Sequence, residues 1–150
     1  MAVLDLLAVY LAAQRKTISA EEAGRLTAAI AALPAQVEQI LSSREQIQYY
    51  ASQYFNHDSV FFIGRNLDYA LGMEGSLKLK EISYIHSEAY AAGELKHGTI
   101  SLIEPGTLVI GVLTQSKLYE KTMSNMVECR SRGAYLLGLS LIHISEPTRH

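Results

Sequence analysis

The sequence predicts an α/β fold in which a parallel sheet follows an all-helical N-terminal segment. Three short apolar runs beyond residue 56 are typical of strands that are buried on both faces. They are Val60–Ile63, Thr107–Leu113 and Tyr135–Leu139. Helical patterns separate these runs, and an alternation of strand and helix is typical of a parallel sheet with helices on its faces.

The first 56 residues predict three helices. Apolar residues recur at helical spacing over Leu4–Leu11, and neither Gly nor Pro interrupts them. Ser19 and Glu22 have the spacing of a capping box, which predicts a second helix through Leu33. Pro34 is expected to end that helix and to stand in the first turn of a third one. We expect residues 1–56 to form one helical connector.

The remaining residues predict the rest of the α/β unit, residues 57–140. Helices are expected over residues 68–83 and 118–132, with Gly133 as the C-terminal cap of the second. In open parallel sheets, ligands collect at the carboxyl ends of strands. Here those ends carry Gly64–Asn66 and Thr114–Ser116. Residues 141–150 continue no recognisable element, so we expect a non-native or disordered tail, with a native C-terminal loop as the alternative.

Composition limits the classes of function. A chain of 150 residues is about one domain, and 13 basic against 15 acidic residues leave a net charge of −2, which argues against nucleic-acid binding. Hydrophobic residues make up 49% and charged residues 19%, so the chain can bury a core. No tract reaches the ~18 apolar residues of a membrane span, and the single cysteine, Cys129, forms no internal disulfide. We expect a cytoplasmic protein that binds neither membranes nor nucleic acids.

One predicted helix carries a candidate catalytic set. Glu74, Lys78 and Glu81 follow one another at intervals of four and three residues, so they share one helix face. A carboxylate beside a cation is suited to act as a general base. Because such pairs are common on exposed helices, the spacing alone favours a solvated ladder of ion pairs.

Two further positions could contribute to a site. His97 lies between Gly93 and Gly98, which allow close approach of a ligand, and histidine titrates near neutral pH. A surface-loop histidine is the simpler alternative. Thr114, Gln115 and Ser116 connect a strand to a helix and are weak candidates for binding a phosphate, although capping by Ser116 explains them equally well.

Other residues favour packing rather than chemistry. Cys129 has no adjacent base and is expected to lie in the core, and His86 is expected to pack among its apolar neighbours. No set of His, Cys or carboxylate residues has convincing metal-ligand spacing, so we expect neither a metal nor an organic cofactor.

The stretch from Leu71 to Gly98 carries a more specific signal. Its residues, LGMEGSLKLKEISYIHSEAYAAGELKHG, closely resemble the isomerase part of the glucosamine-6-phosphate synthases, the isomerizing glutamine–fructose-6-phosphate aminotransferases. The resemblance extends upstream through Phe62–Arg65 and downstream to about Leu139. It implies a connector between two flavodoxin-like sugar-isomerase (SIS) domains, followed by a truncated second SIS domain.

The resemblance also implies roles for four residues. Glu81 corresponds to the base that moves a proton between C1 and C2 of the open-chain sugar, and Lys78 to a cation of the same site. Glu74 corresponds to a supporting carboxylate. His97 corresponds to a histidine that assists ring opening and that crosses a dimer interface, so a homodimer is expected. The substrate would be a sugar phosphate, fructose 6-phosphate, which ammonia from glutamine converts to glucosamine 6-phosphate.

The sequence departs from this family in ways that leave alternatives open. It has no N-terminal cysteine for glutamine hydrolysis, and it lacks the first SIS domain with its phosphate-binding hydroxyls and the C-terminal lysine that forms an imine with the sugar. Thr99 and Asn66 replace a usual proline and a common glycine. We therefore expect the 150-residue chain to be inactive alone. The alternatives are a non-catalytic SIS module that binds sugar phosphates, another SIS enzyme, and a structural segment that dimerises.

Overall fold

The computed structural model describes residues 2–140. The chain divides into two compact units, residues 1–53 and 54–150. The tail predicted at residues 141–150 lies outside the described residues. Within residues 2–140, no helix combines the length and the apolarity that crossing a bilayer requires.

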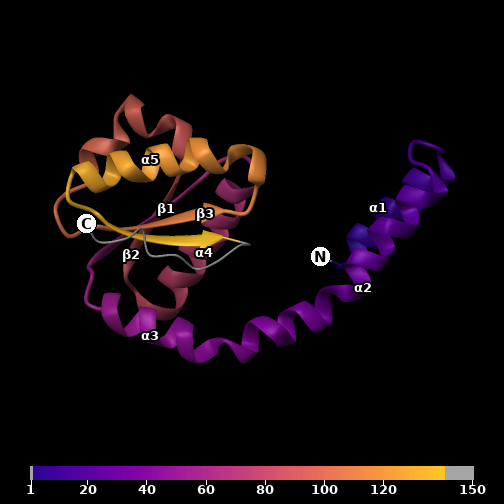
Figure 1. Ribbon diagram of the computed structural model, residues 1–150, viewed down its shortest axis with the longest axis horizontal. Coiled ribbons are helices and arrows are strands. Elements are labelled where there is room, and N and C mark those ends of the chain that lie inside the picture. The colour runs from indigo at the N-terminus through magenta and orange to yellow at the C-terminus, as the bar shows by residue number, and fades with distance from the viewer. Residues whose placement is uncertain (1, 141–150) are drawn as a thin grey trace. The chain divides into compact units, whose positions relative to one another are not determined.

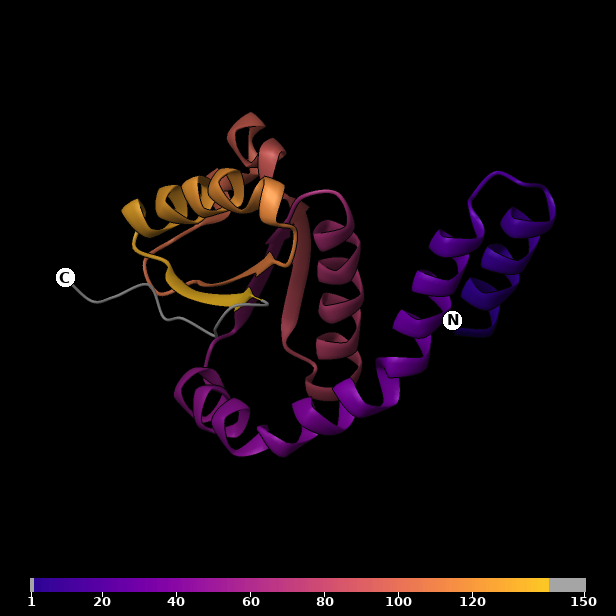
Figure 2. The same ribbon diagram turned by 45° about the vertical axis from the view of Figure 1, so that its right-hand side comes forward.

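The first unit is a helical hairpin with one additional helix. Helices α1 (Ala2–Gln14) and α2 (Ala20–Ser42) lie side by side, and α3 spans Arg44–Tyr54 (Figures 1 and 2). The predicted cap is present, because the Ser19 hydroxyl accepts a hydrogen bond from the Glu22 backbone N–H at 3.1 Å. None of the residues described in these three helices is buried.

The prediction that Pro34 ends a helix was wrong. Helix α2 continues through Pro34 to Ser42, and the break comes at Ser43. A proline removes one backbone donor and crowds the carbonyl four residues earlier, which a helix surrounded by solvent tolerates by bending, because water can take over the freed carbonyl. The local proline rule therefore misplaced the boundary by about two turns.

The second unit is a four-stranded parallel sheet. Its strands are β1 (Ser59–Gly64), β2 (His86–Ala91), β3 (Leu108–Leu113) and β4 (Tyr135–Ser140), in the order β2-β1-β3-β4. All three neighbouring pairs are parallel. The parallel α/β architecture that the sequence predicts is therefore confirmed.

Helices cover both faces of this sheet. Helix α4 (Leu67–Ser83) connects β1 to β2, and α5 (Tyr119–Ser131) connects β3 to β4 (Figures 1 and 2). Short 3-10 helices η1 (Ala92–His97), η2 (Thr99–Leu102) and η3 (Ser116–Leu118) complete the connections. Gly133 follows α5 with a φ of +92° and donates its N–H to the Arg130 carbonyl, as expected for the residue after a helix end.

Alternate residues of β1 build two cores. Phe61 and Ile63 face α5 and η1, where the predicted packing residue Cys129 is fully buried. Phe62 lies in the opposite core beside α4. A Cβ added at Gly75 of α4 would lie 3.1 Å from the Phe62 ring. The absence of a side chain there lets α4 approach the sheet closely.

Strand β2 was not predicted from the sequence. Its residues are mostly polar, because it pairs only with β1 among the described strands and is only partly buried. The prediction that His86 packs inside was wrong as well. The His86 side chain is 62% exposed, and its Nε2 lies 3.5 Å from Glu88 Oε1. His86 begins the strand and is its one exposed residue, while most of the following residues are partly buried, so β2 has no apolar run that would mark it as a strand.

Candidate functional site

Helix α4 brings three of the four predicted catalytic residues together. Lys78 Nζ lies 2.8 Å from Glu81 Oε2 and 3.7 Å from Glu74 Oε1. The three residues share one face because their spacing matches two helical turns. All three side chains are at least half exposed, so the set is open to an incoming ligand.

The electrostatics of this set keep its cation charged. The hydrogen bond from Lys78 to Glu81 raises the pKa of the ammonium group, and attraction to the Glu81 and Glu74 carboxylates adds to the effect. An ammonium group between two carboxylates forms a compact polar surface that can bind hydroxyls and stabilise negative charge developing on a substrate oxygen. The same geometry also fits a solvated ion-pair ladder, so geometry alone does not assign a function.

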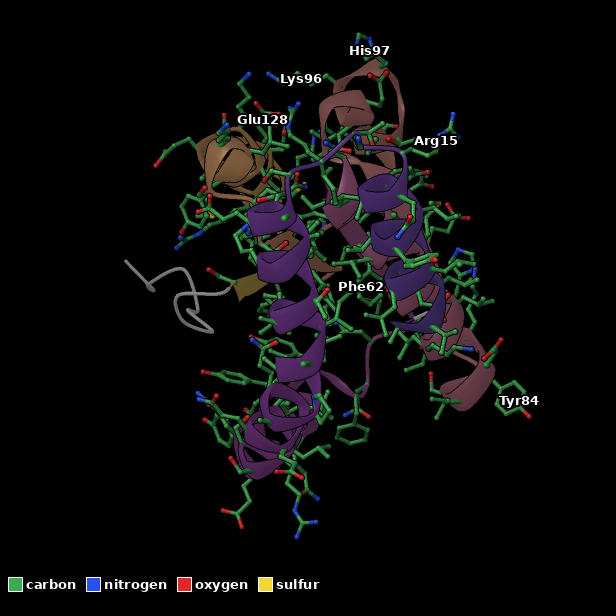
Figure 3. The ribbon with its side chains drawn as sticks, turned by 90° about the vertical axis from the view of Figure 1, so that its right-hand side faces the viewer. Arg15, Phe62, Tyr84, Lys96, His97 and Glu128 are labelled. Carbon is green, nitrogen blue, oxygen red and sulfur yellow. The ribbon has the colours of Figure 1, made fainter. Side chains whose placement is uncertain are left out.

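His97 lies apart from the α4 set. It is the last residue of η1 and is exposed, and Figure 3 shows it at the opposite end of this unit from Tyr84, which follows the C-terminus of α4. Within residues 2–140, the His97 side chain forms no hydrogen bond or ion pair with Glu74, Lys78 or Glu81. One copy of the chain therefore does not assemble all four residues.

One ion pair joins the segment that carries His97 to α5, and a hydrogen bond joins the loop after β1 to the same helix. Lys96 Nζ lies 2.8 Å from Glu128 Oε1, and both side chains are labelled in Figure 3. In the second contact, Arg65 Nη2 donates a hydrogen bond to Asn125 Oδ1 at 2.9 Å. A Cβ at Gly93 would lie 3.0 Å from Arg65 Nη1, so the backbone of η1 rests close to the guanidinium group. These contacts hold the backbone of η1, while His97 itself extends into solvent.

The loop after β3 is held by a residue that the sequence analysis did not select. Asp68, in the first turn of α4, accepts hydrogen bonds from the backbone N–H groups of Thr114 at 3.1 Å and Gln115 at 3.4 Å. Its other oxygen accepts from the Thr114 hydroxyl. Gln115 Nε2 also donates to the Arg65 carbonyl at 2.8 Å. The phosphate-binding role of Thr114, Gln115 and Ser116 stays a prediction, and a phosphate would compete with Asp68 for the same donors.

Strand β2 adds a second polar cluster that was missed. The Tyr90 hydroxyl donates a hydrogen bond to Glu88, whose other oxygen faces His86. Burial and this hydrogen bond raise the pKa of Tyr90 to about 12. The alternation of polar residues over 86–90 was the available signal, because it places all three side chains on one side of a strand.

The matching family model is the SIS domain, which covers residues 53–142. Two relatives are named isomerizing glutamine–fructose-6-phosphate aminotransferases. The protein from Clostridium acetobutylicum is 48% identical over 90% of this chain. The protein from Symbiobacterium thermophilum is 51% identical over 98% of this chain. The chain spans 22% and 24% of their lengths, respectively.

A solved structure gives the same result for the fold. The C-terminal domain of a glucosamine-fructose-6-phosphate aminotransferase from Francisella tularensis superposes with a TM-score of 0.84 and 32% sequence identity. The match covers 89% of this chain and 38% of that one. The sheet and helices described above are thus those of a known sugar-isomerase architecture, and the chain belongs to the SIS domain family.

Proposed function

We propose that this chain supplies acid–base residues to the isomerase site of an isomerizing glutamine–fructose-6-phosphate aminotransferase. The reaction would convert fructose 6-phosphate and glutamine-derived ammonia to glucosamine 6-phosphate. The observation that carries the proposal is the ion-paired set Glu74, Lys78 and Glu81 on an open face of α4. It occurs in a chain that is about half identical to enzymes with that name.

In this proposal Glu81 moves the proton between C1 and C2 of the open-chain sugar. Its Oε2 is 2.8 Å from the Lys78 ammonium, which would stabilise negative charge on the sugar oxygens during proton transfer. Glu74, 3.7 Å from the same ammonium, would keep Lys78 oriented along the helix face. No step needs a metal or an organic cofactor.

The proposal assigns ring opening to His97 of a second copy. The His97 side chain forms no hydrogen bond or ion pair with the α4 set within the described part of one chain. Exposed apolar side chains border the set, with Leu71 and Ile82 exposed by 55% and 79%. Such apolar surface around a polar site favours coverage by another protein surface. A homodimer would provide both the cover and the imidazole.

The test uses a chimera, because the chain corresponds to 22% of the Clostridium acetobutylicum relative. Residues 2–140 would replace the matching segment of that enzyme, and glucosamine 6-phosphate formation would be measured. We expect Glu81→Gln to reduce kcat by roughly 10²–10⁴-fold, the usual contribution of a general base. Glu120→Gln, which removes an exposed carboxylate from the first turn of α5, is the matched control and should retain activity.

One outcome would count against this proposal, and another against the expectation that the chain is inactive alone. Unchanged turnover in the Glu81→Gln chimera would remove the catalytic assignment. Formation of glucosamine 6-phosphate by the isolated 150-residue chain would contradict the expectation that it is inactive alone. The rival function, a non-catalytic module, predicts that fructose 6-phosphate raises the melting temperature of the chain while the chimera shows no turnover.

A further inference from the structure

The buried carboxylate of Asp68 occupies the position where a parallel sheet would be expected to bind an anion. Asp68 is 1% exposed and lies in the first turn of α4, the helix that follows β1. Its oxygens accept from the backbone N–H groups of Thr114 and Gln115, directly after the carboxyl end of β3. Backbone N–H groups beside the start of a helix are the donors that proteins use to bind phosphate groups.

The Asp68 carboxylate forms no ion pair in the part of the chain that the structure describes. Burial of a charge is costly unless hydrogen bonds compensate it. Here the compensation comes from neutral donors, the two N–H groups and the Thr114 hydroxyl, and from the positive end of the α4 dipole.

We propose that the Asp68 carboxylate occupies the hydrogen-bond donors of this loop and thereby prevents phosphate groups from binding there. The donors of Thr114 and Gln115 are then occupied, so the phosphate of a substrate does not bind to them. The same hydrogen bonds attach the start of α4 to the end of β3. Asp68 is therefore also a positioning residue for the helix that carries Glu74, Lys78 and Glu81. Only the identity of the excluded anion, a sugar phosphate, rests on the proposed function.

The side chain at position 68 should decide whether the loop accepts an external anion. Asp68→Ser shortens the side chain so that it no longer reaches Thr114 and Gln115, which frees two N–H groups and a hydroxyl. Glu120→Gln removes one negative charge from an exposed position and leaves the loop unchanged. Both variants remove one negative charge, but only Asp68→Ser frees the donors of the loop. Their comparison therefore shows whether phosphate binds because these donors are free or because the chain repels phosphate less.

The experiment is a titration of the ¹⁵N-labelled 150-residue chain with inorganic phosphate, followed by NMR. In Asp68→Ser, the amide signals of Thr114 and Gln115 should shift and saturate at roughly millimolar phosphate. In the wild-type chain and in Glu120→Gln they should not move over the same range. The proposal is overturned if the wild-type amides respond like those of Asp68→Ser, or if the Asp68→Ser amides do not respond.

A second measurement needs no variant. If the Asp68 carboxylate holds these donors, the amide hydrogens of Thr114 and Gln115 should exchange with solvent at least about tenfold more slowly in the wild-type chain than in an unfolded peptide. Exchange at the unfolded rate would overturn the proposal even if Asp68→Ser does not fold. Neither readout involves turnover, so failure of the isomerase assignment and failure of this inference are distinguishable.

Discussion

Replacement of Gly64 by alanine should destabilise the SIS unit by displacing α4 from β1. A Cβ at this position would lie 2.5 Å from the Asp68 carbonyl carbon, 2.6 Å from its oxygen and 2.7 Å from the Tyr69 nitrogen. Ordinary contact begins at 3.4 Å, so the backbone of α4 would have to move by close to an ångström. All three obstructing atoms belong to the backbone, so no side-chain rotation relieves the clash.

Overpacking of a core lowers the free energy of unfolding by about 1–3 kcal/mol. Because the obstructing backbone is rigid, we expect Gly64→Ala to lower it by about 3 kcal/mol. At roughly 4–8 °C per kcal/mol for a domain of this size, the melting temperature should fall clearly. Urea unfolding followed by NMR signals of buried strand residues such as Ile63 measures the change.

The matched control for this substitution is Gly24→Ala in α2. A Cβ there meets nothing within 4 Å, so alanine should be neutral or stabilise the helix by up to about 1 kcal/mol. The reasoning about backbone contact is refuted if Gly64→Ala retains wild-type stability within about 1 kcal/mol. The same variant should also accelerate hydrogen exchange at Thr114, because movement of the first turn of α4 separates Asp68 from that amide.

Four further predictions follow from burial, capping and titration. Burial raises the pKa of the Cys129 thiol to about 11, so at pH 8 an alkylating reagent should label it only after urea unfolds the chain. The pKa of Tyr90 is raised to about 12, so the neutral phenol stabilises the fold fully below pH 10. This contribution to the free energy of unfolding is lost between pH 10 and 12, and Tyr90→Phe should flatten that part of a curve of stability against pH. Ser19→Ala should cost about 1 kcal/mol of α2 stability, seen as lower helicity by circular dichroism. Met126→Ala, at a side chain 1% exposed, should cost about 2–5 kcal/mol in urea unfolding.

The sequence predicted those elements whose signals are local. The apolar runs of β1 and β3 identify strands because both of their faces are covered. The apolar run of β4 also forms a strand, but Tyr135 and Leu139 in it are 53% and 39% exposed, so the expectation that this strand is buried on both faces was wrong. Strand β2 was missed because an outer strand with one partner keeps polar side chains. The continuation of α2 through Pro34 was missed because it depends on solvent around the helix, and a residue pattern does not encode solvent exposure.

The candidate site was predictable to a similar extent. Helical spacing alone brings Glu74, Lys78 and Glu81 together, and the structure has them in contact. Asp68 was not found, because its importance comes from its contact with Thr114, which is 46 residues away in the sequence. An acidic residue in the first turn of a helix that follows a buried strand was the only local signal, and it equally suits the helix dipole.

The all-parallel pairing has a consequence for how this chain acquires its structure during synthesis. Neighbouring strands here are never joined by a tight hairpin, since each pair is connected through a crossover. Strand β1 pairs with both β2 and β3, so the ribosome must release the chain past Leu113 before β1 gains its second neighbour. Until then the backbone N–H and C=O groups along that edge of β1 are unpaired, so slow translation through this region would prolong the time in which β1 can pair with strands of other nascent chains.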